Sequence, residues 1–215
     1  MAASLFAVGQ REYDPHFYLG ARAGMTFSQM EFSPGVEQSM LSGFTAGITA
    51  RYVEEKYFGI IAELNFDQRG WKEFYEDTDF KYERRLTYIE LPVLTHLYFG
   101  KRNFKGFLNL GPYVGYMISS SITSNFNYHD TESVEGFPPD RHVNQMTMDV
   151  KHKFDYGILA GLGCELRVKG RHSINIEARY YYGLGNIFPA AKKDEFSASR
   201  GSSIQVALGY YFQLK

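Results

Sequence analysis

Cysteine and long apolar runs are the two things this sequence lacks most clearly. Cys164 is the only cysteine among 215 residues, which excludes an intrachain disulfide and a cysteine-based metal cluster. No run of roughly 18 apolar residues occurs, and this excludes a transmembrane helix. It leaves a membrane barrel open, because barrel strands need only about 9–11 alternating residues.

The chain also lacks a surplus of charge of either sign. Its 23 basic and 24 acidic residues are interspersed and leave a net charge of −1. Neither a Lys/Arg run nor an RNA-binding signature is present. Nucleic acid is therefore not an expected partner, and no cofactor motif is found.

What the sequence has in abundance is aromatic residues (17%), glycine (21 residues) and a two-residue alternation of apolar with small or polar side chains. Such a period is that of a β-strand, whereas a helix repeats every 3.6 residues. The clearest stretch has these residues on its apolar face: Phe58, Ile60, Ala62, Leu64 and Phe66.

Eight such stretches are predicted as strands, and the gaps between them alternate long and short. The short gaps are charged turns of hairpin length, at 54–56, 100–103 and 169–171. This order predicts an all-β fold: an eight-stranded, antiparallel, up-and-down transmembrane β-barrel with short periplasmic turns, long extracellular loops and periplasmic termini. The predicted strands are 16–28, 41–53, 57–68, 84–99, 104–119, 153–168, 172–186 and 202–214.

Alternation alone also fits a soluble barrel or sandwich, in which the polar face lies in water. The distribution of lysine favours the membrane, because all lysines fall in turns, loops or strand ends. Mid-strand positions of the polar face instead carry glycines, which suit a crowded barrel interior and would only weaken a water-facing strand.

Aromatic residues gather at both ends of the apolar face, as in the interfacial girdles of membrane barrels. Trp71 is interpreted as a further anchor at the rim, with part of a ligand surface as the alternative. The predicted girdle consists of Phe17, Tyr52, Phe58, Phe66, Trp71, Phe99, Tyr116, Tyr182 and Phe212.

Charged residues on the opposite face predict a paired network inside the barrel, because an unpaired charge there costs several kcal/mol. The structural interpretation is a network that fills the lumen; the functional alternative is a proton or ion path or a catalytic carboxylate pair. The network comprises Arg22, Arg51, Glu63, Glu90, Glu165, Arg167, Glu177 and Arg179. His96 is expected to be a hydrogen-bonded interior residue.

The N-terminal segment 1–15 reads as the remnant of a signal peptide, with a disordered tail as the alternative, and 16–215 as one barrel domain. The loop 120–152 is long enough to be functional or disordered. It carries His129, Ser133, His142 and nearby carboxylates, which offer a metal site or a Ser-His-Asp relay. No diagnostic catalytic spacing is present, so we expect solvated loop residues and no metal site.

Several segments form a combined motif set: Phe66-Asp67-Gln68-Arg69-Gly70-Trp71, Tyr88-Ile89-Glu90-Leu91-Pro92-Val93-Leu94, Gly111-Pro112-Tyr113-Val114-Gly115-Tyr116, Phe154-Asp155-Tyr156-Gly157, Gly161-Leu162-Gly163 and Arg179-Tyr180 with Tyr182-Gly183-Leu184. Together they resemble the PorT-type outer-membrane β-barrel proteins of Bacteroidetes, over nearly the whole chain from about residue 16. The resemblance implies a barrel in the outer membrane, and the family's namesake is associated with protein secretion across that membrane.

The expected function is therefore non-enzymatic: surface binding or envelope scaffolding by a monomer in outer-membrane lipid, with loop 120–152 as the contact for a ligand or protein partner. The alternatives are a PorT-like secretion accessory, an outer-membrane enzyme using the loop histidines, and a porin-like small-solute channel. The channel is the weakest of these, because eight charged lumen groups should block flow.

Overall fold

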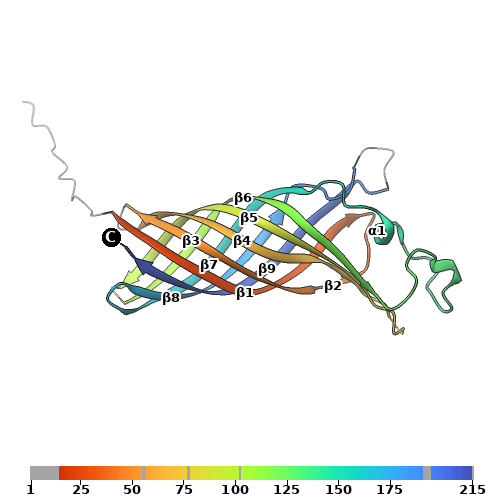
Figure 1. Cartoon of the computed structure of the whole chain (residues 1–215), viewed down its shortest axis with the longest axis horizontal. Helices are drawn as coiled ribbons and strands as arrows, with labels where there is room; N and C mark the ends of the chain where they lie inside the picture. The colour runs from red at the N-terminus through yellow and green to blue at the C-terminus, as the bar shows by residue number, and fades with distance from the viewer. Residues whose placement is uncertain (1–14, 55–56, 77, 102, 191–194, 215) are drawn as a thin grey trace, which may run out of the picture.

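The computed structural model describes residues 15–54, 57–76, 78–101, 103–190 and 195–214. The predicted signal-peptide remnant lies, except for Pro15, outside the described residues. The described chain forms one long antiparallel barrel with its connecting loops at the two ends (Figure 1). The predicted all-β barrel is confirmed.

Eight strands close the ring, and a two-residue strand, β2, pairs with the end of β4. Every pairing is antiparallel, and β1 closes the barrel by pairing with both β3 and β9. The strands are β1 (His16–Ser33), β2 (Gln38–Ser39), β3 (Leu41–Val53), β4 (Phe58–Glu73), β5 (Tyr82–Lys101), β6 (Phe104–Ser124), β7 (Phe154–Lys169), β8 (His172–Gly183) and β9 (Ala198–Gln213).

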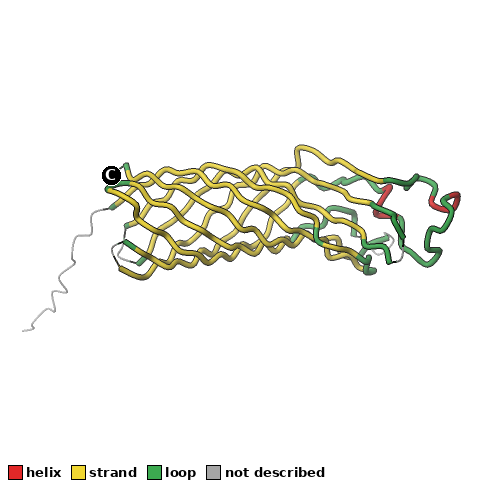
Figure 2. Tube along the Cα trace, turned by 90° about the horizontal axis from the view of Figure 1, so that it is seen from below, coloured by secondary structure: helices red, strands yellow, loops and turns green. Residues whose placement is uncertain are grey.

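The connections differ at the two ends of the barrel. Short turns join β3 to β4, β5 to β6 and β7 to β8, and both His16 and Gln213 lie at this short-turn end. In the β7–β8 turn, Gly170 has a φ of +54°, a left-handed conformation that glycine adopts without a steric penalty. The opposite, long-loop end carries the other connections (Figure 2).

Two short helices lie in the β6–β7 connection at the long-loop end: η1 (Thr131–Ser133) and α1 (Asn144–Thr147). Among the described residues, no helix is long and apolar enough to cross a membrane.

The alternation predicted from sequence sorts the side chains onto the two faces of the wall. Outward apolar side chains are bare: Ile48, Leu162 and Leu208 are each more than 60% exposed. An exposed apolar surface that encircles the protein needs an apolar surrounding. The inward face of the same strands is buried and mostly polar. This arrangement is inside-out relative to a soluble barrel.

Most strands run further at the long-loop end than the sequence predicted. β4 continues to Glu73, β5 begins at Tyr82, and β6 reaches Ser124. The outer face of these extensions is polar, so the apolar alternation stops there while the ladder of hydrogen bonds continues. β8 behaves differently and ends at Gly183, which leaves the wall uneven in height.

Candidate functional site

The lumen is filled by buried charged side chains that lie in successive layers. At the short-turn end, Arg51 forms a salt bridge with Glu165. The Arg51 guanidinium lies between the rings of Tyr18 and Tyr211, 4.3 and 4.1 Å from their centroids. The cavity beside this pair measures only 10 Å³, about enough for one water molecule.

The middle layer is centred on Glu63, which binds two arginines at once. The Arg179 Nη atoms donate to its two carboxylate oxygens at 2.6 and 2.7 Å, and Arg22 Nη1 donates to Oε2 at 3.2 Å. Arg179 Nε also lies 2.7 Å from Glu177. Each charge in this layer therefore has a partner of opposite sign, as burial requires.

A chain of polar groups links the middle layer to the layer below it. Asn109 Nδ2 donates to Glu177 Oε1 at 2.7 Å, and Asn109 Oδ1 lies 2.7 Å from His96 Nδ1. His96 is buried and lies among Tyr98 and Phe107. It is an interior hydrogen-bonding residue, as expected from the sequence.

Glycine makes room for these groups on the inward face. A Cβ added at Gly161 would lie 2.5 Å from Glu177 Oε1, and one at Gly47 would lie 2.0 Å from Asn65 Oδ1. Both distances are shorter than any tolerable contact, so larger residues here would displace the polar network.

The uppermost charged layer is built around Arg69. Its Nη2 atom lies 2.5 Å from Glu90 Oε1 and 2.8 Å from Asp155 Oδ2, and its Nε lies 3.8 Å from Asp67. The guanidinium also stacks 4.2 Å from the ring centroid of Tyr88. One arginine thus faces three carboxylates, a task that suits its planar, five-donor head group.

Asp67 has further partners that reach across the lumen. Thr26 Oγ1 donates to its Oδ1 at 2.7 Å, and Gln205 Nε2 donates to the same atom at 2.9 Å. These neutral donors stabilise a carboxylate that is 3.8 Å from its nearest cation.

Above the Arg69 layer the interior becomes mostly apolar. Segments from the loops fold over the mouth and pack on the inward side chains of the extended strands. Trp71 is completely buried and contacts Phe32 and Phe188 edge to face, with ring centroids 5.3 and 6.3 Å away. We call this cluster the cap; its buried members are Met30, Phe32, Trp71, Tyr75, Tyr82, Leu86, Tyr88, Met117, Met146, Val150, Ile187, Phe188 and Phe196.

Hydrogen bonds fasten the long β6–β7 connection into the cap. Tyr82 Oη donates to the Met146 carbonyl at 2.9 Å, and Arg84 Nη1 donates to the Met148 carbonyl at 2.6 Å. Gln145 Nε2 donates to Glu73 Oε1 at 2.8 Å. The part of this connection around α1 is therefore packed into the barrel mouth.

Glu73 is a buried carboxylate at the edge of the cap. Tyr75 Oη donates to it at 3.1 Å, and Arg141 Nε lies 3.7 Å away. Burial raises the pKa of the Glu73 carboxyl to about 7, despite the opposing effect of these neighbours. Its charge therefore changes near neutral pH. Along β4, Glu73 lies beyond the aromatic level marked by Phe66.

The predicted girdle residues, with one exception, point outward at the two ends of the apolar belt. Phe17, Tyr52, Phe58 and Phe99 lie at the short-turn end and are 37–65% exposed. Tyr116 lies at the other level and is 55% exposed. Phe66, Tyr182 and Phe212 are half-buried. Aromatic rings at two levels suit the interfaces of a bilayer.

Comparison with known proteins agrees with this architecture. Residues 10–189 match the family described as outer membrane protein beta-barrel domain. The chain belongs to this family. A barrel of this family lies in the bacterial outer membrane, so the exposed belt faces lipid. No relative was found among curated protein sequences.

Three solved structures are similar to this chain over most of their length, and the match to OprG supports the barrel fold. OprG from Pseudomonas aeruginosa has a TM-score of 0.53 at 11% identity, and the match covers 92% of this chain and 96% of OprG. Neisserial surface protein A has a TM-score of 0.44 at 14% identity, covering 90% and 95%. Ail of Yersinia pestis has a TM-score of 0.43 at 13% identity, covering 91% and 99%.

The lumen of this outer-membrane barrel brings together seven of the eight charged residues named from the sequence. Glu90 is paired there by Arg69. Arg167 is the exception. It lies half-buried near the β7–β8 turn, where its Nη2 donates to Gln213 Oε1 at 2.5 Å. The sequence placed it too deep, because the strand ends two residues later.

Trp71 was assigned to the wrong face. It is not an interface anchor but the centre of the cap. Inward and outward positions alternate along β4, and Trp71 lies five positions after outward-facing Phe66, so it falls on the inward face. The sequence interpretation ended the strand at 68 and so did not apply the alternation to residue 71.

Arg69 is the central lumen cation that the predicted charge network left out, and Asp67 and Asp155 were left out with it. The motifs that resemble PorT-type proteins supply this layer: Asp67 and Arg69 come from the first, Tyr88 and Glu90 from the second, Tyr113 from the third and Asp155 from the fourth. The available signal was that these motifs lie far apart in the sequence and contain charged residues to which no partner had been assigned.

The loop residues that suggested chemistry do not form a site among the described residues. Ser133 Oγ donates to Asp130 at 2.6 Å, and the tilted rings of His129 and Tyr128 contact each other with centroids 4.3 Å apart. Within the described part of the chain, no group of three or more His, Cys, Asp or Glu side chains could hold a metal ion.

Proposed function

We propose that this protein is a non-enzymatic, non-conducting outer-membrane barrel that binds a partner or scaffolds the envelope at the cell surface. Its long-loop end faces outward and its short turns and termini face the periplasm, the usual orientation of such barrels. The protein acts as a monomer in lipid, and the β6–β7 connection, residues 120–152, provides the contact surface.

One observation carries this proposal: the lumen is blocked at two levels. Paired charges fill the lumen at the membrane level, and the apolar cap closes the mouth above them. A solute would have to break buried ion pairs to pass, at a cost of several kcal/mol for each pair. What remains accessible is the outer surface of the long-loop end.

Planar bilayers test the closure directly. Purified full-length protein should insert without single-channel steps, and so should a variant with the loop histidines removed (His129→Ala, His142→Ala, His152→Ala). Discrete conductance steps from the wild-type protein would refute the closed barrel. A change in the lipid A or phospholipid profile of cells carrying the triple variant would instead favour an enzyme.

A second candidate, accessory function in protein secretion across the outer membrane, is supported by the motifs shared with PorT-type proteins. Side chains from these motifs meet around Arg69 and form one layer of the lumen. A deletion strain should then lose export of secreted proteins, and plasmid-borne wild-type protein should restore it. Normal export in the deletion strain would rule this candidate out and leave the surface-binding role standing.

A further inference from the structure

At the long-loop end, β5 and β6 extend further than β7. One edge of β6 is therefore unpaired there. β6 pairs with β7 only as far as Tyr116 opposite Phe154, and its last cross-strand bond on that side runs from Met117 N to the Lys153 carbonyl at 2.8 Å. On its other side, β6 stays paired with β5 up to Ser124. Among the residues that the structure describes, residues 118–124 have a strand neighbour on the β5 side alone.

The register shows which groups of this edge are free. Just beyond the strand, Asn125 N donates to the Lys81 carbonyl, which lies on the β5 side. Backbone groups of a strand alternate between its two neighbours, so the N–H and C=O groups of Ser120 and Ile122 point away from β5. Within the described part of the chain, these groups accept or donate no hydrogen bond to another segment.

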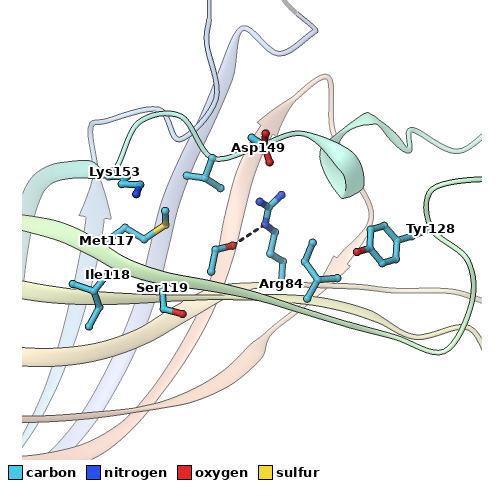
Figure 3. Close-up of a pocket in the computed structure, with 10 residues that line it drawn as sticks. Arg84, Met117, Ile118, Ser119, Tyr128, Asp149 and Lys153 are labelled. Carbon is cyan, nitrogen blue, oxygen red and sulfur yellow. Dashed lines mark hydrogen bonds between the residues drawn. The ribbon is translucent and has the colours of Figure 1, made fainter.

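The chain that should continue β7 is held elsewhere. Arg84 donates from Nε to Ser120 Oγ at 3.1 Å and from Nη1 to the Met148 carbonyl at 2.6 Å. Tyr82 holds the Met146 carbonyl in the cap. These bonds hold residues 146–148 at the mouth, where they cannot pair with β6, and a groove of 550 Å³ separates the edge from the segment before Lys153 (Figure 3).

The edge has few of the features that protect exposed strands. Residues 118–124 read Ile-Ser-Ser-Ser-Ile-Thr-Ser, without charge or proline. Lysine, proline and inward charges are the usual devices that prevent pairing at an edge. The outward side chains Ser119, Ser121 and Thr123 are polar and exposed, which places this edge in water above the lipid.

We propose that residues 118–124 of β6 receive an extended peptide segment of a partner protein as an additional antiparallel strand. This inference rests on the proposed surface-binding function and names its site. Main-chain donors and acceptors of an extended peptide are the chemistry that matches free groups spaced along a strand. The groove floor supplies Met117, Ile122 and Val150 for alternate apolar side chains.

Charge at the groove selects an acidic segment. Lys153 and Arg84 line it, against the single carboxylate of Asp149. A second copy of this chain does not fit the edge: a two-fold axis along the membrane normal would cross strands tilted 35–45° at roughly 70–90°. A flexible peptide has no such restriction.

A displayed library of random dodecapeptides, selected against full-length protein in nanodiscs, tests this proposal. Enriched peptides should carry apolar residues at every second position together with Asp or Glu. Ile122→Pro removes one free N–H without breaking the β5 ladder, and it should weaken binding of a synthetic enriched peptide about tenfold, as expected for loss of one hydrogen bond. Ile122→Val, which keeps the N–H, should bind within about twofold of wild type.

Charge is tested with a matched pair. Lys153→Glu should weaken binding about tenfold, whereas Lys151→Glu, outside the groove, should leave it unchanged. Unchanged Trp71 fluorescence and gel mobility verify that each variant is folded.

Equal binding to Ile122→Pro, or the enrichment of no peptide, would overturn strand addition. Neither result affects the proposal that the barrel is closed, because single-channel conductance in planar bilayers tests that proposal independently.

Discussion

Two regions of one barrel exclude water by opposite means. At the membrane level the lumen is filled with arginines and carboxylates, whereas at the long-loop end it is filled with aromatic and aliphatic side chains. Lipid already surrounds the first region, so its wall can turn apolar groups outward and polar groups inward. The second lies in water and must place its apolar groups inside. Within β4, the inward side chains change from charged to apolar between Arg69 and Trp71.

The two regions should respond differently to loss of a side chain. A charged layer tolerates no missing partner, because the remaining charges stay buried and uncompensated. An apolar cluster loses area and packing in proportion to what is removed.

Removing Arg69 should have the largest effect. Arg69→Met leaves Glu90, Asp155 and Asp67 facing one another without a cation, and we expect a loss of about 5 kcal/mol or more in unfolding free energy. Urea unfolding in lipid vesicles measures it. Adding Glu90→Gln should recover part of the loss. Arg85→Met, at a partly exposed pair with Glu83, should cost less than about 1 kcal/mol and serves as control.

Removing the centre of the cap should cost less. Trp71→Ala creates a cavity among Phe32 and Phe188, and a loss of about 3–5 kcal/mol is expected. Hydrogen exchange should show α1 losing protection while strands at the Arg179 layer keep theirs. If both regions lost protection equally, the cap and the lumen would be one cooperative unit and the comparison would fail. Phe99→Ala, on the lipid face, is the matched aromatic control.

Glu73 should make the stability of the cap depend on pH. Its pKa is about 7 in the folded protein against 4.5 for an unperturbed glutamate, so the folded cap binds a proton more tightly. Stability is therefore highest below pH 4.5, falls by up to about 3 kcal/mol as pH rises to 7, and is flat above that. Trp71 is the only tryptophan and its fluorescence reports this transition. The Glu73→Gln variant should lack the slope; a slope of wild-type size in it would assign the effect to other groups.

Removing the cation at the rim of the cap should have the smallest effect. Arg141 lies over the Tyr75 ring at 4.1 Å and reaches exposed Glu37 at 3.2 Å. Arg141→Met should lower cap stability by about 1 kcal/mol, seen by Trp71 fluorescence, with unchanged unfolding of the barrel by circular dichroism. A loss as large as that of Arg69→Met would show that the cap also depends on its ions.

The sequence predicted the barrel well because lipid imposes a strict rule on outward residues. Alternation placed Arg22, Arg51, Glu63 and Arg179 inside the barrel, where they lie. The rule fails where lipid ends. Beyond Phe66 the outer face turns polar, the strand boundary is lost from the pattern, and Arg69 and Trp71 were assigned to a loop although the same alternation continues through them.

Pairing was less predictable than position. Glu63 binds Arg22 and Arg179 from two other strands, and Arg69 binds Glu90 and Asp155 from two more. Which carboxylate meets which arginine depends on the stagger of strands around the ring. A sequence carries that register only through turns and packing, so balanced charges could be expected without their partners.

The two-residue period was enough to place the membrane-level strands, their order and the face that meets lipid, because the solvent on each side of the wall imposes that pattern locally. Tertiary structure decided the rest: the layer around Arg69, the burial of Trp71 and the bare edge of β6. Each of these depends on closing the ring, since closure sets the register, and the register decides which side chains meet across the lumen and which strand is left without a neighbour.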